Sequence, residues 1–233
     1  MSETTVKKGS ELLKRVEGFH DRTMFRGQPR EWPLLPKIGR LRKHLKWFDN
    51  WRVFHQHLIE RFQRYGRPHF EELPRTEIEW LVHAQHHGLP TRLLDWTTNP
   101  LKALFFAVEN FAYDSCDGVL WMLEPNVWWE SLRIENQQYW DNCLAAFFPE
   151  HLNARLIAQD GCFLSFPLPE NQRPMKPLGC TTGLEKGIKV MRRFRIPGIA
   201  KASLRRELAL LGITHRSLFP GLDGVGKSVQ LEL

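Results

Sequence analysis

The sequence predicts a single α+β domain in which a mostly antiparallel central sheet follows a helical N-terminal region. Apolar residues recur at helical intervals in the first third of the chain, whereas short apolar runs between turn residues predominate later. A chain of 233 residues with 42% hydrophobic content can bury one full core, and no internal repeat or low-complexity tract divides it. We therefore expect one domain over 1–233, with a mainly helical part at 1–75 and an α+β core at 76–233.

Caps and spacings predict the N-terminal elements. Ser10 is a favourable N-cap for a helix that extends to Phe19. The run Met24–Arg26 is expected as a short strand that ends at a glycine turn. Apolar residues recur at intervals of three and four over 40–65, the period of an amphipathic helix, and Asp49–Asn50 divides that helix in two.

Turn residues delimit the elements of the core. Two prolines in 66–74 predict a loop, and the helix that opens at Arg75 ends at Gly88–Pro90. Pro100 is well tolerated at the first position of the next helix, expected over 101–111. Strands are expected at 118–123, 155–158, 162–166 and 189–196, and a closing helix at 200–211.

The composition narrows the class of protein and partner. With 33 Lys and Arg against 26 Asp and Glu, the formal net charge is +7, which favours an anionic partner such as a nucleic acid or a phosphorylated ligand. There is no secretory signal pattern and no apolar run of about 18 residues, so we expect a cytoplasmic chain with no membrane partner. Irregular spacing predicts reduced, mostly buried thiols at Cys116, Cys143, Cys162 and Cys180.

One motif is rejected. Residues 221–228 fit the phosphate-binding loop pattern letter for letter. That loop works because it follows a buried strand and opens a helix whose N-terminal amides hold the phosphates. Here Phe219–Pro220 precedes the motif and only five residues follow it, so we expect no stable helix there and no nucleotide hydrolysis by this route.

The densest polar chemistry lies in 81–107. His83 and His87 are four residues apart, the spacing of paired metal ligands on one helix face. A third ligand is not found beside them, because Ala84 stands where metalloproteases place a glutamate. We therefore predict no metal, and His87 with its neighbour His86 can instead interact with the exposed carbonyls of the last helical turn.

Two interpretations remain open for Gln85, Arg92, Asp95 and Trp96. The arginine and the carboxylate could pair with each other and brace the loop, with the indole in the core. The same combination of a planar cation, an indole face and an amide also suits a nucleotide-type ligand with its ring and phosphates.

Three motifs are similar to those of the FRG domain, a family named for its Phe-Arg-Gly triplet and found mostly in bacteria and phages. They are Phe25–Gln28, the block 84–97 and the ending 218–224. Because FRG proteins are suspected in bacterial conflict systems, the resemblance implies a toxin or phage-defence effector, with an antitoxin or defence-system partner.

A weaker resemblance is to ADP-ribosyltransferases, which implies a fold of that kind and NAD as substrate. By that resemblance Arg26 would hold the pyrophosphate and Thr97 would brace the nicotinamide pocket. The third motif of those enzymes contains a glutamate, and the matching region 153–163 has none. Gln159 can hydrogen-bond a ribose but supplies no charge, whereas Asp160 could supply it.

The leading prediction is an NAD-linked ADP-ribosyltransferase-like enzyme or glycohydrolase, with a nucleic acid or a protein as the acceptor of any transfer. A nucleic-acid-binding or nuclease module that uses His86, His87 and Asp95 is one alternative, and the basic residues of 40–67 and 192–206 would contact the nucleic-acid backbone. A non-catalytic nucleotide sensor is the other. The predicted catalytic residues are Arg26, Gln159, Asp160 and His87. The predicted ligand-binding residues are Gly27, Gln28, Gln85, His86, Arg92, Asp95, Trp96 and Thr97.

Overall fold

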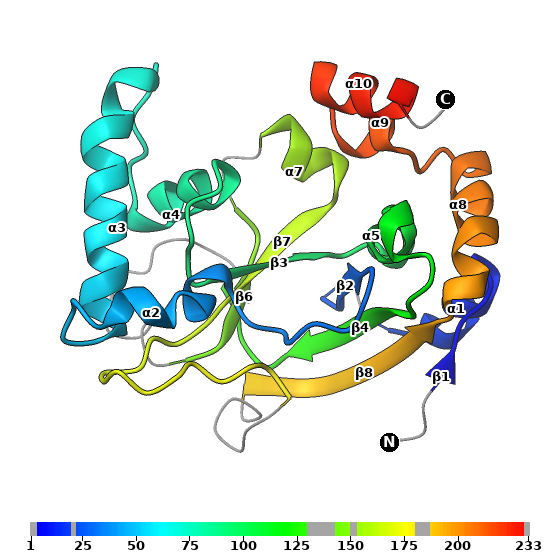
Figure 1. The fold of residues 1–233 in the computed structure, drawn as a ribbon, viewed down its shortest axis with the longest axis horizontal. Coiled ribbons are helices and arrows are strands. Elements are labelled where there is room, and N and C mark those ends of the chain that lie inside the picture. The colour runs from blue at the N-terminus through cyan, green and yellow to red at the C-terminus, as the bar shows by residue number, and fades with distance from the viewer. Residues whose placement is uncertain (1–3, 20–21, 130–142, 150–152, 180–186, 231–233) are drawn as a thin grey trace.

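The strands of the chain form one curled, mixed sheet that confirms the α+β class (Figure 1). The computed structural model describes residues 4–19, 22–129, 143–149, 153–179 and 187–230. The described strands are β1 Thr4–Thr5, β2 Met24–Gln28, β3 Leu93–Thr97, β4 Gly118–Pro125, β5 Trp128–Trp129, β6 Ala145–Phe147, β7 Gly161–Ser165 and β8 Ile188–Ile196. The described α-helices are α1 Gly9–Val16, α2 Arg42–Leu45, α3 Trp51–Gly66, α4 Glu77–His86, α5 Pro100–Val108, α7 Ala154–Ala158, α8 Lys201–Leu210, α9 His215–Leu218 and α10 Leu222–Gln230. Short 3-10 turns lie at Lys37–Arg40, Arg67–His69, Phe111–Tyr113 and Gly198–Ala200.

The strand order is β1-β8-β4-β2-β3-β7-β6-β5, and the sheet has a seam at its centre. The terminal pairs β1–β8 and β5–β6 are parallel, and the other pairs are antiparallel. Strand β2 pairs along its whole length with residues 119–123 of β4, and β3 and β7 pair with each other along their whole lengths. In contrast, β2 and β3 meet only at Phe25 and Thr97. The two halves of the sheet therefore diverge beyond this pair.

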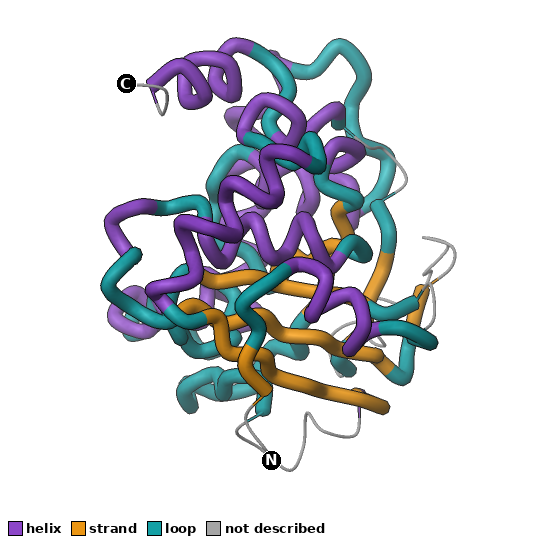
Figure 2. Tube along the Cα trace, turned by 90° about the vertical axis from the view of Figure 1, so that its right-hand side faces the viewer, coloured by secondary structure: helices purple, strands orange, loops and turns teal. Residues whose placement is uncertain are grey.

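The two halves are covered by different helices. Helices α1, α5 and α8 pack over the half formed by β2, β4 and β8, and α3 and α4 pack beside β3, β6 and β7 (Figure 1). A third apolar cluster joins the start of α3 to the sheet, with Trp51 fully buried against residues such as Met24 and Trp96. Most described helices lie on one side of the strands (Figure 2).

Caps explain where several helices begin. The break in the long helical segment is confirmed, because Asn50 caps α3 by accepting a hydrogen bond from Val53 N at 3.0 Å. The prediction for the first helix is wrong in detail: Lys8 is its N-cap, Ser10 lies in its first turn, and it ends at Val16.

Two other predictions are wrong. Residues 155–158 lie in helix α7 rather than in a strand, because the Asn153 side chain caps that helix by accepting from Leu156 N at 2.8 Å. The rejected motif at 221–228 does form a helix, α10, although α9 and a proline precede it and no strand does. We still reject a phosphate-binding loop, because such a loop follows a buried strand and no strand directly precedes α10.

Strand β2 extends further than predicted, so Arg26 lies in mid-strand and not before a turn. The described cysteines form no disulfide with one another; Cys162 is buried, Cys116 and Cys143 are half-buried, and Cys180 lies outside the described residues. Among the residues that the structure describes, no helix has both the length and the apolar character needed to cross a membrane.

Candidate functional site

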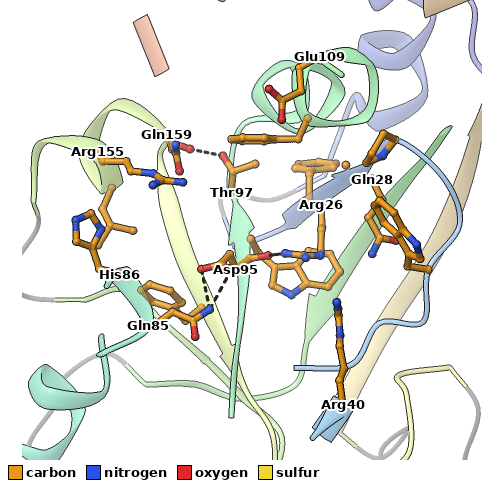
Figure 3. A pocket seen from close by; sticks show the side chains of 18 residues that line it. Arg26, Gln28, Arg40, Gln85, His86, Asp95, Thr97, Glu109, Arg155 and Gln159 are labelled. Carbon is orange, nitrogen blue, oxygen red and sulfur yellow. Dashed lines mark hydrogen bonds between the residues drawn. The ribbon is translucent and has the colours of Figure 1, made fainter. Parts of the chain in front are cut away.

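A cavity of about 410 Å³ opens where β2 and β3 diverge, and α5 and α7 contribute to its walls (Figure 3). This volume lies within the range of small-molecule sites. All but three of the residues predicted for the site line the cavity: Arg26, Gly27, Gln28, Gln85, His86, Asp95, Trp96, Thr97 and Gln159. The fold thus brings together motifs that are far apart in the sequence.

Arg26 projects from β2 across the seam. Its Nη1 donates a hydrogen bond to the backbone oxygen of Asp95 at 2.5 Å. Its Nε is buried and has no hydrogen-bond partner among the described residues. Burial lowers the pKa of Arg26, an effect that the nearby Asp95 charge opposes and Arg40 adds to. A buried, unpaired N–H on a cation is costly, and an anionic ligand in the cavity would satisfy it.

The Asp95 carboxylate is held from the other side by α4. Gln85 Nε2 donates to both carboxylate oxygens, at 3.1 and 3.3 Å (Figure 3). Gln85 is itself oriented, because its Oε1 accepts from Thr91 Oγ1 at 2.5 Å. The carboxylate therefore has a fixed place at the cavity wall and balances part of the Arg26 charge.

Aromatic groups form much of the remaining wall. The ring of Trp96 is buried, and its Nε1 has no hydrogen-bond partner among the described residues. Trp32, Phe106 and Phe163 also line the cavity. Flat apolar faces beside buried donors suit a ligand that combines a ring with acceptor atoms.

Thr97 and Gln159 join β3 to the segment before β7. Thr97 Oγ1 donates to the backbone oxygen of Gln159 at 2.6 Å (Figure 3). The Gln159 side chain donates from Nε2 to the backbone oxygen of Leu218 at 3.1 Å. Because Leu218 is the last residue of α9, this hydrogen bond fixes the Gln159 amide to α9, and α9 therefore supports this wall of the cavity.

The structure does not bring Arg92 or His87 into the cavity. Arg92 is 3% exposed and donates from Nε to Ser165 Oγ at 3.2 Å, and burial together with its charge lowers the pKa of His55 to about 3. Arg92 therefore lies in the core rather than in the cavity, with Ser165 as one of its partners. His87 is the C-cap of α4, and its ring stacks on Phe62 at 6.4 Å between centroids.

Asp160 does not line the cavity, and its carboxylate binds two side chains at the start of α5. It has a left-handed backbone with φ of 46°, and its carboxylate accepts from Lys102 Nζ at 2.7 Å and from Asn99 Nδ2 at 3.3 Å. This ion pair holds the start of α5 against the turn before β7. We interpret Asp160 as part of the support of the site.

Replacing Asn99 with alanine is expected to loosen this support. Asn99 Oδ1 accepts from Leu101 N and Lys102 N at 3.0 and 3.2 Å and so caps α5. The loss of a cap lowers the free energy of unfolding by about 1–2 kcal/mol. Urea unfolding measures it, with Asn99→Ser as a control that keeps a capping oxygen. Equal losses in the two variants would contradict the capping role.

Three charged residues of the cavity were missed by the sequence analysis: Arg40, Arg155 and Glu109. The arginines lie at the end of a 3-10 turn and on the helix that was predicted as a strand. Glu109 follows α5 as its C-cap. A carboxylate at a helix C-terminus is disfavoured by the helix dipole, and this is the sequence signal that could have identified it.

Metal ligands are not grouped in the part of the chain described. No cluster of three or more His, Cys, Asp or Glu side chains there could hold a metal ion. The His83 and His87 spacing therefore finds no third described ligand. The prediction that no metal is required stays a prediction.

Comparison with known proteins supports the resemblance to the FRG domain over part of the chain. Residues 21–115 match the family model described as FRG domain. No curated protein and no solved structure matches the chain. The matched span includes Arg26, Asp95 and Glu109, whereas Arg155 and Gln159 lie beyond it.

Proposed function

We propose that the cavity binds a nucleotide of the NAD type and that the protein cleaves the bond between nicotinamide and ribose. The product would be free ADP-ribose, as in a glycohydrolase, or ADP-ribose transferred to a protein or nucleic acid. The observation that carries the proposal is the buried Nε of Arg26, a cationic donor that has no hydrogen-bond partner among the described residues and lies at a seam that opens into a cavity. A diphosphate supplies the acceptor atoms and the negative charge that this group lacks.

The charge and shape of the cavity support a dinucleotide. Arg40 and Arg155 add to the positive charge of Arg26, against the two lining carboxylates of Asp95 and Glu109. The aromatic walls offer stacking faces for a base or a nicotinamide ring. Arg26 and Thr97, which by the resemblance to ADP-ribosyltransferases would hold the pyrophosphate and brace the nicotinamide pocket, lie on neighbouring strands and both line the cavity.

Of the three residues predicted for the nuclease alternative, His86 and Asp95 line the cavity and His87 does not. His86 lines the cavity, and burial and nearby cations lower its pKa, which favours a neutral imidazole that can act as a base. His87, its proposed partner, lies outside the cavity. A role as a toxin or defence effector remains an implication of the FRG resemblance.

Calorimetric titration with NAD, followed by mass analysis for nicotinamide, tests the proposal. We expect saturable binding of NAD and slow release of nicotinamide. The same samples are assayed on single-stranded and double-stranded DNA and RNA with and without Mg²⁺. Binding without release would favour the nucleotide sensor, and cleavage of nucleic acid without NAD binding would overturn the proposal in favour of the nuclease.

A further inference from the structure

Glu109 is an acidic side chain in an unfavourable place. It lies at the C-terminal end of α5 and lines the cavity, at the opposite end from Arg40 in the view of Figure 3. Its side chain is 27% exposed. Burial raises its pKa, and the charges of Lys227 and Arg155 only partly oppose this. Both desolvation and the helix dipole therefore disfavour the carboxylate form that it would carry at neutral pH.

A buried histidine from a distant segment faces this carboxyl group. His215 Nε2 lies 3.2 Å from Glu109 Oε2, and the His215 side chain is 9% exposed. Nε2 has no partner in hydrogen-bond geometry among the described residues. Burial, with the charge of Lys227, lowers the pKa of His215. The two groups thus form a titratable pair at the cavity wall, in which the two side chains are close together but make no well-formed hydrogen bond.

The position of His215 is closely defined by its surroundings. Its ring lies between Phe105 and Phe219, with centroids 5.0 and 5.6 Å away. Thr214 and Ser217 form a capping box that begins α9 at His215. The histidine is therefore held beside Glu109 by packing and by a cap, although their own contact contributes no well-formed hydrogen bond.

The segment that carries His215 is also tied to the opposite wall. Gln159 donates to the Leu218 oxygen, and the Arg155 guanidinium lies 4.8 Å above the Phe219 ring. Helix α9 thus connects α7 with α5 at one end of the cavity.

We infer that Glu109 is the catalytic carboxylate of this cavity. His215 acts through Glu109 as a positioning residue, and it accepts the proton that Glu109 takes up. The inference rests on the proposed function. A half-buried carboxyl group beside a buried imidazole, at the wall of a cavity that contains cationic side chains, is an arrangement suited to general base catalysis. The glutamate absent from 153–163 would then be supplied from the end of α5.

The reaction balances with these groups. The oxygen of a water molecule, or of an acceptor hydroxyl, forms a bond to the anomeric carbon of the ribose as the bond to the nicotinamide nitrogen breaks. The bonding electron pair goes to that ring nitrogen, which becomes neutral. The proton of the attacking oxygen goes to the Glu109 carboxylate and from there to His215 and solvent.

The pH dependence follows from the direction of the shifts. Glu109 acts as a base only when ionised, so nicotinamide release should fall as pH decreases through a pKa above the ordinary glutamate value. The charged groups that face the pair are Arg155 on α7 and Lys227 on α10, and both oppose that rise. Removing His215 should move this acidic limb of the profile.

The test compares Glu109→Gln and His215→Gln with the exposed control Glu60→Gln on α3. Glu109→Gln should bind NAD within about threefold of the wild type and release nicotinamide at least about 100-fold more slowly. His215→Gln should be about tenfold slower, with a displaced acidic limb. Wild-type release by Glu109→Gln would overturn the inference alone. No release by the wild-type protein would overturn the proposed function as well.

A stability measurement gives a second, independent readout. The pKa of Glu109 is higher in the folded state than in the unfolded chain. Ionisation of Glu109 therefore destabilises the folded state once the pH exceeds the pKa that Glu109 has in the unfolded chain. Glu109→Gln removes that cost, so Tm should rise by about 1–3 °C at pH 8 and should not rise at pH 4. A lower Tm at pH 8 would show that the carboxylate is a structural group and would overturn the inference.

Discussion

Gly27→Ala is expected to prevent stable folding. A Cβ at this position would lie 1.7 Å from the backbone oxygen of Ala103 and 2.8 Å from Ala107 N. Both atoms belong to the backbone of α5, which packs directly on β2 (Figure 1). No side-chain rotation relieves this contact, so the helix itself would have to move. Overpacking of a core costs about 1–3 kcal/mol, and a backbone clash of this size should exceed that range.

Urea unfolding measures this effect, with Gly226→Ala as the control. A Cβ at Gly226 meets nothing within 4 Å, and that residue lies in helix α10, where alanine is favourable. We expect the control to equal or exceed the wild type and Gly27→Ala to be insoluble or unfolded. An unfolding free energy within about 1 kcal/mol of the wild type for Gly27→Ala would contradict this account of the triplet.

Arg26→Ala is expected to reduce NAD affinity by at least about 100-fold, because it removes a cation at the cavity wall whose buried Nε lacks a described partner. Arg26→Lys keeps the charge but not the planar fork, so we expect an intermediate loss of about tenfold. Calorimetric titration measures both. The control Arg42→Ala removes an exposed cation outside the cavity and should bind as the wild type does. Equal losses in the Arg26 and Arg42 variants would show that only net charge matters.

The sequence predicts the parts of the site that local signals define. The helix before Gly88, the loop to β3 and the start of α5 follow from Gly, Pro and Asn residues whose backbone preferences act locally. For this reason Gln85, Asp95 and Thr97 were correctly expected to lie close together. The residue spacing alone could not show that Arg92 lies outside the cavity. Arg92 is buried against Ser165 of β7, a strand that is distant in the sequence.

The missed residues depend on contacts that no local pattern contains. The short run around Arg155 reads equally as a strand, and only the Asn153 cap makes it a helix. Glu109 gains its significance from His215, which reaches it through α8 and α9. Strands β1, β5 and β6 are two or three residues long, too short to show the alternation on which strand prediction depends.

The proposed function is tested most directly by the amount of nicotinamide that the wild-type protein and Arg26→Ala release from NAD under the same conditions. We predict release by the wild-type protein that rises with NAD concentration to saturation, and release by Arg26→Ala that stays near the rate without protein. The account would be contradicted if the wild-type protein released no nicotinamide, or if Arg26→Ala released it at the wild-type rate.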